Sequence, residues 1–115
     1  MKKEWQKKIY IASQMDELDD YGKNIYDTPR EYWFNVQPLS SKAEMEMFGQ
    51  NASEIQRAVI SRADYEGMFK EFDVAYLDGA TPEGETYNGE KANYRLYPPR
   101  NQNVVTLLYF EKLVK

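Results

Sequence analysis

The residues most able to do chemistry in this chain are carboxylates that occur as close neighbours. They form the pairs Asp16/Glu17, Asp19/Asp20, Glu44/Glu46 and Glu83/Glu85. A general acid and its base need two carboxylates that converge in a cleft, with the pKa of one of them raised. Nothing in the spacing of these pairs indicates convergence. We therefore interpret each pair as part of a solvated, charged loop.

Two binding motifs can also be tested by spacing. A calcium loop of the EF-hand type needs regularly spaced oxygen ligands, then a Gly, and a Glu at its last position. If the pattern starts at Asp16, Leu18 falls on a ligand position, and if it starts at Glu17, Thr28 takes the place of the final Glu. The glycines at 79, 84 and 89 lack the Lys and Ser or Thr of a phosphate loop. We predict no metal site and no cofactor.

The composition excludes much of the usual enzymatic repertoire. The chain has 115 residues and contains no Cys and no His, so disulfides, thiolate nucleophiles, Cys/His zinc sites and imidazole bases are excluded. We predict a protein that is not an enzyme. The length fits one domain, 1–115, and the 42% apolar and 30% charged residues are ordinary for a soluble globular protein.

The charge and the apolar pattern of the chain indicate its cellular compartment and the classes of partner that it has. No apolar window is long enough to span a membrane, and the basic start MKKEWQKK is not followed by the apolar stretch of a signal peptide. We expect synthesis in the cytoplasm and no membrane partner. The net charge of −4 suits a protein that DNA passes rather than one that holds DNA tightly.

The segment 32–44, YWFNVQPLSSKAE, predicts a strand that leads directly into a helix. Tyr32, Phe34 and Val36 alternate with more polar residues, which is the period of a half-buried strand. Pro38 ends the strand because it has no N–H to donate. Ser41 and the Glu three residues later have the spacing of a reciprocal N-terminal cap. We expect a helix at 41–48 with Ala43, Met47 and Phe48 on its buried side, ended by Gly49.

Further short strands with turn signals between them predict the fold class. The expected strands are 7–13, 30–37, 54–62, 73–77, 93–97 and 104–114. The segment 54–62 also has helical spacing, and we favour a strand there because a turn signal follows at 64–67. The last is apolar on both faces, which predicts a central position, and Pro98–Asn101 is expected to form the turn before it. The long connections are 14–29, with a hairpin extension, 39–53 and 78–91. We predict a mainly β protein, a small antiparallel β-barrel or sandwich of five to seven strands with one short helix and long loops.

The order of these segments resembles the head–tail joining proteins of tailed bacteriophages, the head-closure, stopper or adaptor family. The resemblance runs from about Lys7 to Leu113 and is carried by KKIYIAS, DDYGKNIY, YWFNVQPLSSKAE, AVISR, FKEFDVAYLDG, ANYRLYPP and NVVTLLYFEKL. It implies a structural virion protein at the neck that forms a homo-oligomeric ring between portal and tail. Such a ring closes the head around packaged double-stranded DNA and gives the tail a docking surface. We expect a monomer in solution and portal, adaptor and tail proteins as partners.

The resemblance also implies which residues make contacts. The assembly or channel loop would contain Ser40, Ser41, Lys42, Glu44, Glu46, Met47, Gln50 and Asn51. Secondary contact loops would contain Asp19, Asp20, Tyr21, Glu83, Glu85 and Tyr87. Two alternatives remain open, a tail-completion or tail-terminator protein and a small nucleic-acid-binding β-barrel. A basic patch is missing, which counts against the second alternative.

Overall fold

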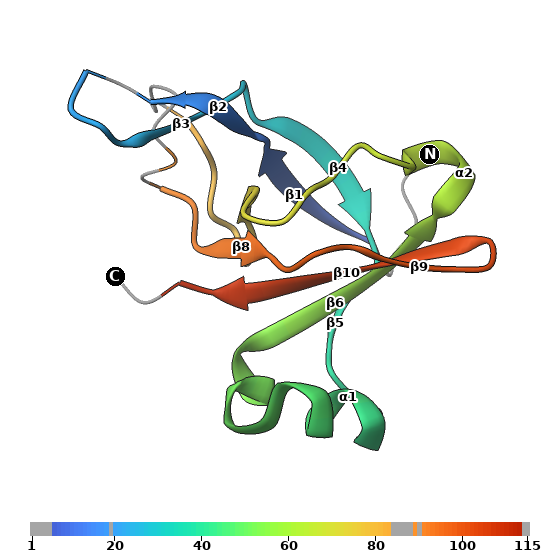
Figure 1. The fold of residues 1–115 in the computed structure, drawn as a ribbon. Coiled ribbons are helices and arrows are strands. Elements are labelled where there is room, and N and C mark those ends of the chain that lie inside the picture. Colours follow the sequence, from blue (N-terminus) through green and yellow to red (C-terminus); the bar gives the residue numbers. More distant parts are fainter. Residues whose placement is uncertain (1–5, 19, 84–88, 90, 114–115) are drawn as a thin grey trace.

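The computed structural model describes residues 6–18, 20–83, 89 and 91–113 and is drawn in Figure 1. Its strands are β1 (Lys7–Ala12), β2 (Gln14–Leu18), β3 (Asn24–Tyr26), β4 (Arg30–Phe34), β5 (Val36–Pro38), β6 (Ile55–Ser61), β7 (Val74–Tyr76), β8 (Tyr94–Leu96), β9 (Arg100–Gln102) and β10 (Val105–Lys112). Its helical segments are α1 (Lys42–Phe48), the 3-10 helix η1 (Gly49–Glu54) and the single turn α2 (Arg62–Tyr65). The predicted class, mainly β with one short helix, is confirmed.

One antiparallel sheet curls into a nearly closed barrel. Its strands follow the order β4-β1-β7-β8-β10-β6-β5, and β9 joins it by pairing with β10. The first and last strands of this order are consecutive in the chain, with only Asn35 between them. Phe34 in β4 lies opposite Lys7 of β1, whereas Val36 in β5 lies opposite Ala58 of β6. The segment predicted as one strand therefore changes partner at Asn35, which brings the two ends of the sheet together.

The alternation predicted around Phe34 is confirmed. The Phe34 and Val36 side chains are 5% and 1% exposed, whereas Gln37 faces solvent. Tyr32 packs against the same core, with its ring centroid 5.2 Å from that of Phe34. The main core inside the barrel consists of Ile9, Ile11, Phe34, Val36, Ala58, Ile60, Phe69, Ala75, Leu77, Tyr94, Leu96, Leu108 and Phe110.

β10 occupies the predicted central position. It pairs along its length with β6 on one edge and with β8 and β9 on the other. The turn predicted at Pro98–Asn101 is wrong, because Arg100 already pairs with Leu107 in the β9–β10 hairpin. The chain turns instead at Asn103, whose φ of 53° is a left-handed value that Asn tolerates better than most residues.

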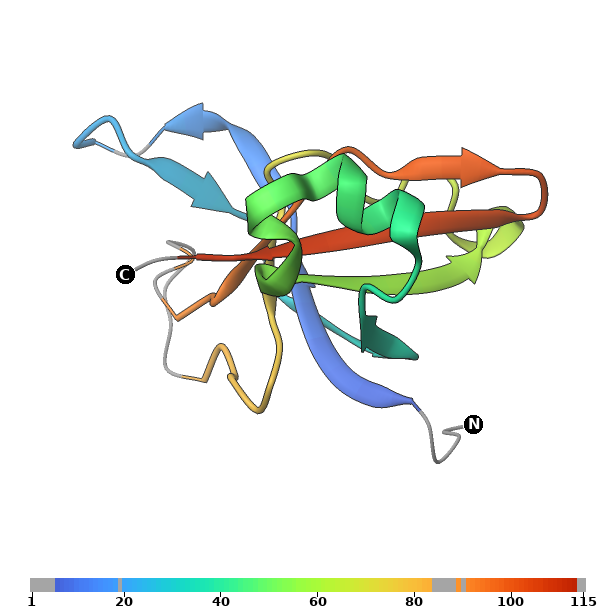
Figure 2. The same cartoon turned by 90° about the horizontal axis from the view of Figure 1, so that it is seen from below.

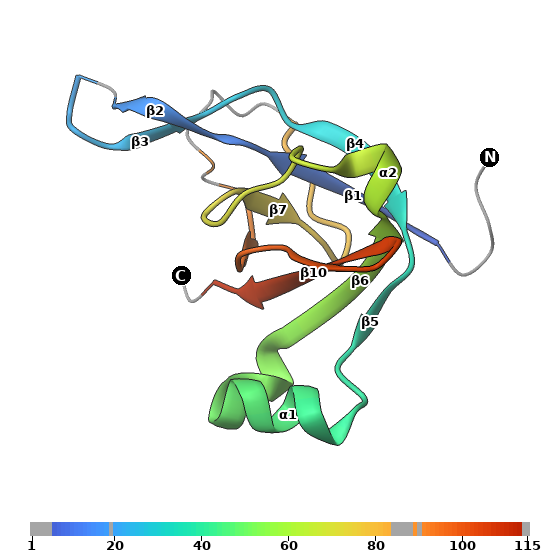
Figure 3. The same cartoon turned by 45° about the vertical axis from the view of Figure 1, so that its right-hand side comes forward.

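A second hairpin projects from one end of the barrel (Figures 1 and 3). β2 pairs with β3, so the hairpin extension predicted within 14–29 is confirmed. The base of the hairpin is held by Asp73, which has no exposed surface. Its carboxylate accepts hydrogen bonds from the backbone N–H groups of Gln14 at 3.0 Å and Lys70 at 2.9 Å. Burial raises the pKa of Asp73, although these hydrogen bonds act in the opposite direction.

Candidate functional site

The helical connection, α1 with η1, lies outside the barrel and crosses over β10 (Figure 2). Its start follows the predicted cap, since the Ser41 hydroxyl accepts a hydrogen bond from the Glu44 N–H at 3.1 Å. Its end is also where the sequence predicts it. Gly49 has a φ of 58° and donates its N–H to the Met45 carbonyl.

The buried side of α1 matches the prediction only at Phe48, which is half-buried and packs against Tyr97 and Tyr109. Ala43 and Met47 are exposed, and Glu44 is the one described residue of α1 that is buried. The reason is that the first turn of α1 faces β6 and β10, where Arg57 and Tyr109 supply hydrogen-bond donors. A carboxylate can be buried there because its charge and its lone pairs are satisfied.

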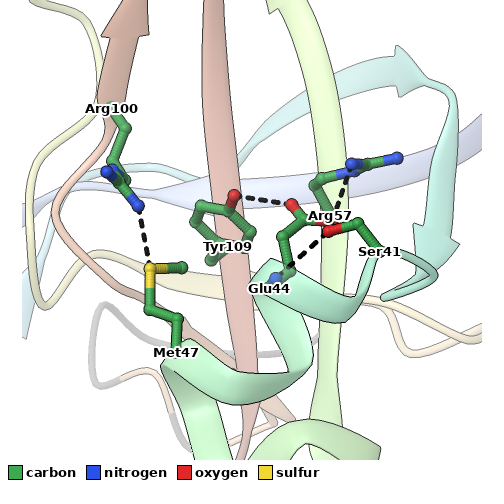
Figure 4. A network of polar contacts seen from close by, with 6 residues as sticks. All are labelled: Ser41, Glu44, Met47, Arg57, Arg100 and Tyr109. Atoms are coloured by element: carbon green, nitrogen blue, oxygen red, sulfur yellow. Dashed lines mark hydrogen bonds and ion pairs between the residues drawn. The ribbon is translucent and has the colours of Figure 1, made fainter.

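The Glu44 carboxylate is the centre of a polar network that joins α1 to the sheet (Figure 4). One oxygen accepts from Arg57 Nη1 at 2.9 Å and from Ser41 Oγ at 3.1 Å. The other accepts from Tyr109 Oη at 2.7 Å, which is the length of a strong, charge-assisted bond. We call Ser41, Glu44, Arg57 and Tyr109 the carboxylate clasp.

The protonation states in the carboxylate clasp are fixed by the same contacts. Burial raises the pKa of Glu44, but the hydrogen bonds from Tyr109 and Ser41 and the charge of Arg57 outweigh burial and lower it. Burial and the hydrogen bond to Glu44 raise the pKa of Tyr109 to about 12. The carboxylate therefore stays ionised and the phenol stays neutral at physiological pH. The ionised carboxylate therefore keeps its hydrogen bonds to Arg57 and Tyr109, which hold α1 against the sheet.

Apolar packing beneath the clasp completes the attachment of the helical connection. Leu39, Ile55 and Tyr109 form a small core separate from that of the barrel. The Phe48 ring lies against two tyrosines, with centroids 5.0 Å from Tyr97 and 5.1 Å from Tyr109. Leu39, before α1, and Phe48, at its end, thus both pack the helical connection onto the barrel.

A second polar network, centred on a carboxylate of β10, has the same partner types as the carboxylate clasp, an Arg and a Tyr. Glu111 accepts from Arg95 Nε at 2.8 Å and from Tyr97 Oη at 2.7 Å. Burial raises the pKa of Glu111, but these two partners lower it overall, and the pKa of Tyr97 rises to about 12. Tyr97 and Phe48 are in contact, so this network supports the helical connection from its far side.

A groove lies beside the clasp on the outer face of the sheet. It has a volume of about 400 Å³ and is lined by Ala43, Glu44 and Met47 of α1, Arg57 of β6, Arg100 and Gln102 of β9, and Leu107 and Tyr109 of β10. Arg100 Nη1 lies 2.8 Å from Met47 Sδ at its rim (Figure 4). We call this hollow the sheet-face groove.

The structure distributes the predicted contact residues over separate places. In the helical connection, every candidate except Glu44 is exposed, namely Ser40, Ser41, Lys42, Glu46, Met47, Gln50 and Asn51. Asp20 and Tyr21 are exposed on the β2–β3 hairpin, and Glu83 is exposed on the loop between β7 and β8. Asp19, Glu85 and Tyr87 lie outside the described residues. The two secondary loops meet where Gly89 lies against the Tyr26 ring, away from the helical connection.

Sequence reasoning missed the partners of Glu44. Arg57 lies two residues after Ile55 in a predicted strand, which places both on one face but does not place Arg57 against a given helix. Tyr109 lies in a strand that is apolar on both faces, so it gave no sign of a polar contact. In the described part of the chain, no three acidic residues come together in a way that would hold a metal ion. No helix in this part is long and apolar enough to cross a membrane.

These features define a small, nearly closed antiparallel β-barrel with a clasped external helix. No protein-family model matches the chain, and no curated protein matches it. Among solved structures, it is similar to the solution structure of protein SF1141 from Shigella flexneri 2a, with a TM-score of 0.56 and 15% sequence identity. The match covers 94% of this chain and 92% of the other. The two proteins share a fold over almost their whole length.

Proposed function

We propose that this protein is a structural subunit of the neck of a tailed phage. It forms a ring between portal and tail, closes the DNA-filled head, gives the tail a docking surface and has no catalytic role. One observation carries the proposal. Three separate projections of the barrel expose large apolar side chains: Leu18 (60% exposed) and Tyr21 (89%) on the β2–β3 hairpin, Met45 (47%) and Met47 (46%) on α1, and Val104 (79%) at the β9–β10 turn.

The distribution of these side chains supports assembly rather than pairing with one partner. Exposed apolar groups on several projections indicate several contact surfaces. A ring subunit needs such surfaces, because it meets a neighbour on each side and other proteins above and below. The carboxylate clasp supports the proposal further, since a helix already held in place loses little conformational entropy when it docks.

The same features fit a tail-completion or terminator protein, which also forms rings at a tail end. Mixing the protein separately with portal and with tail assemblies distinguishes the two. The other alternative, a nucleic-acid-binding barrel, draws support from the exposed Lys7 and Lys8 at the start of β1. It predicts DNA affinity that falls steeply with salt concentration, because binding releases counterions from the phosphates.

The test is electron microscopy of the purified protein with the portal encoded beside it. We expect ring density on the portal with the natural chain, and portal, capsid and tail genes on either side of its own gene. Met45→Glu should abolish the ring and leave the melting temperature unchanged, because Met45 is exposed. Ala63→Glu, on the exposed face of α2, is the matched control and should retain the ring. Absence of rings on both portal and tail, together with salt-dependent DNA binding, would refute the proposal.

A further inference from the structure

We propose that the β2–β3 hairpin of one subunit docks into the sheet-face groove of the next copy. This contact rests on the proposed function, because it would be the lateral interface of the ring. The occupant of the groove is thus a second copy of this chain, and the segment that enters is the β2–β3 hairpin, described at 14–18 and 20–26.

The groove combines the apolar side chains of Ala43, Met47 and Leu107 with two arginines and the Glu44 carboxylate. Arg57 lies opposite Tyr109 in the β6–β10 pairing, and Arg100 lies opposite Leu107 in the β9–β10 pairing. Residues that lie opposite each other share a face of the sheet. Both guanidinium groups therefore stand on the face that carries the half-buried Leu107, and Val59, which pairs with Leu107 from β6, is 45% exposed on the same face.

One of the two guanidinium groups keeps its charge available. Arg57 forms an ion pair with Glu44 at 2.9 Å. Arg100 is exposed, and within the described residues it contacts the Met47 sulfur and forms no ion pair. Because Glu44 in the groove is paired with Arg57, the uncompensated charge of the groove is that of Arg100, and a docking segment with a carboxylate beside apolar side chains would complement it. Arg is also well suited to hold a carboxylate, because its planar head can donate two parallel hydrogen bonds.

The β2–β3 hairpin presents that combination. Asp16 and Asp20 are exposed, and between and beside them Leu18 is 60% exposed and Tyr21 is 89% exposed. Tyr is enriched at protein interfaces, since it brings a large apolar ring at a low cost in side-chain entropy. We infer that Leu18 and Tyr21 cover the apolar side chains of the groove while the aspartates face Arg100.

The positions of the two surfaces make the contact intermolecular. The hairpin projects from one end of the barrel, and α1 lies on another side (Figures 1 and 3). The groove lies beside α1. A projection on one side that enters a recess on another gives head-to-tail association, which produces rings when the rotation closes. The contact involves few residues, so a single copy of it is weak, and the portal would have to gather the subunits before the ring closes.

The test uses the fact that the chain contains no Cys. Asn24→Cys marks the hairpin and Gln102→Cys marks the rim of the groove, and both positions are exposed. With a short bismaleimide on portal-bound protein, the chain carrying both cysteines should give a ladder of cross-linked oligomers. An equimolar mixture of the two single variants should stop at the heterodimer. A chain with Asn24→Cys and Ala63→Cys is the matched control and should give at least several-fold less product.

Charge reversal then identifies the residues involved. Arg100→Glu and Asp20→Arg should each reduce the ladder several-fold, and their combination in one chain should restore it. About 0.5 M salt should also reduce the ladder, since exposed charges are screened. Cross-linking of Asn24→Cys chains to one another as strongly as to the groove, or an unchanged ladder with Arg100→Glu, would overturn the contact. If rings still appear on the portal in that case, the proposed function stands; if none appear with the natural chain, the function itself fails.

Discussion

Replacement of Glu44 tests whether the carboxylate clasp holds the helical connection. Glu44→Ala removes the acceptor of the Tyr109 hydroxyl, which is buried, and a buried donor left without a partner costs about 1–3 kcal/mol. It also removes the ion pair with Arg57, whose side chain is 25% exposed, so this loss is reduced by solvent. We expect the free energy of unfolding to fall by about 2–4 kcal/mol, which is about 8–16 °C in melting temperature at about 4 °C per kcal/mol.

Urea unfolding followed by circular dichroism measures this change, and Glu46→Ala is the matched control. Glu46 is exposed on the same helix, so its replacement should change the free energy of unfolding by less than about 0.5 kcal/mol. A double-mutant cycle of Glu44→Ala with Tyr109→Phe should cost at least about 1 kcal/mol less than the sum of the single changes, because both remove one contact. Equal costs at Glu44 and Glu46, or strict additivity in the cycle, would refute the role of the clasp.

Three other measurements test the core and the titrating groups. Phe34→Ala should lower the free energy of unfolding by about 3–5 kcal/mol, whereas Gln37→Ala on the outer face should change it by less than about 0.5 kcal/mol. The lowered pKa of Glu44 means that its stabilising contribution is present above its ordinary pKa of 4.5 and is lost as the pH falls further, so the acid midpoint should shift upward in Glu44→Ala. Tyr97 and Tyr109, with pKa values raised to about 12, should stabilise the fold below pH 10 and lose that effect as the pH approaches 12, seen as a late step in tyrosinate absorbance.

The sequence predicted most of the barrel because its strands have a simple signal. Alternation around Phe34 identified the inner face, and the apolar run in 104–114 identified the central strand. Both signals follow from burial of alternate side chains, which the local sequence records directly. The change of partner at Asn35 was missed, because alternation continues through it. A strand that pairs with β1 before the bend and with β6 after it has the same pattern as a straight strand.

The candidate site was less predictable because its energetics depend on distant residues. The spacing of Ser41 and Glu44 is a cap signature, and the cap is present. The same signature suggested that the Glu44 side chain was occupied locally and otherwise solvated. Its actual partners, Arg57 and Tyr109, are 13 and 65 residues away in the chain. No local pattern reports a contact at that separation, so the burial of Glu44 follows only from the fold.

Two of the three projections that the proposed ring would use are held by a buried carboxylate. Glu44 ties α1 to β6 and β10 through side-chain donors, and Asp73 ties the base of the hairpin to the turn at Lys70 through backbone N–H groups. Burying a carboxylate is costly, and that cost is offset only where its hydrogen bonds are complete. A carboxylate with all of its hydrogen bonds made holds the elements that it joins in one position. A weak, repeated contact gains most from such fixation, because every copy then docks without an ordering cost. In the proposed ring, the buried acids of this barrel would therefore serve assembly by making its projections rigid.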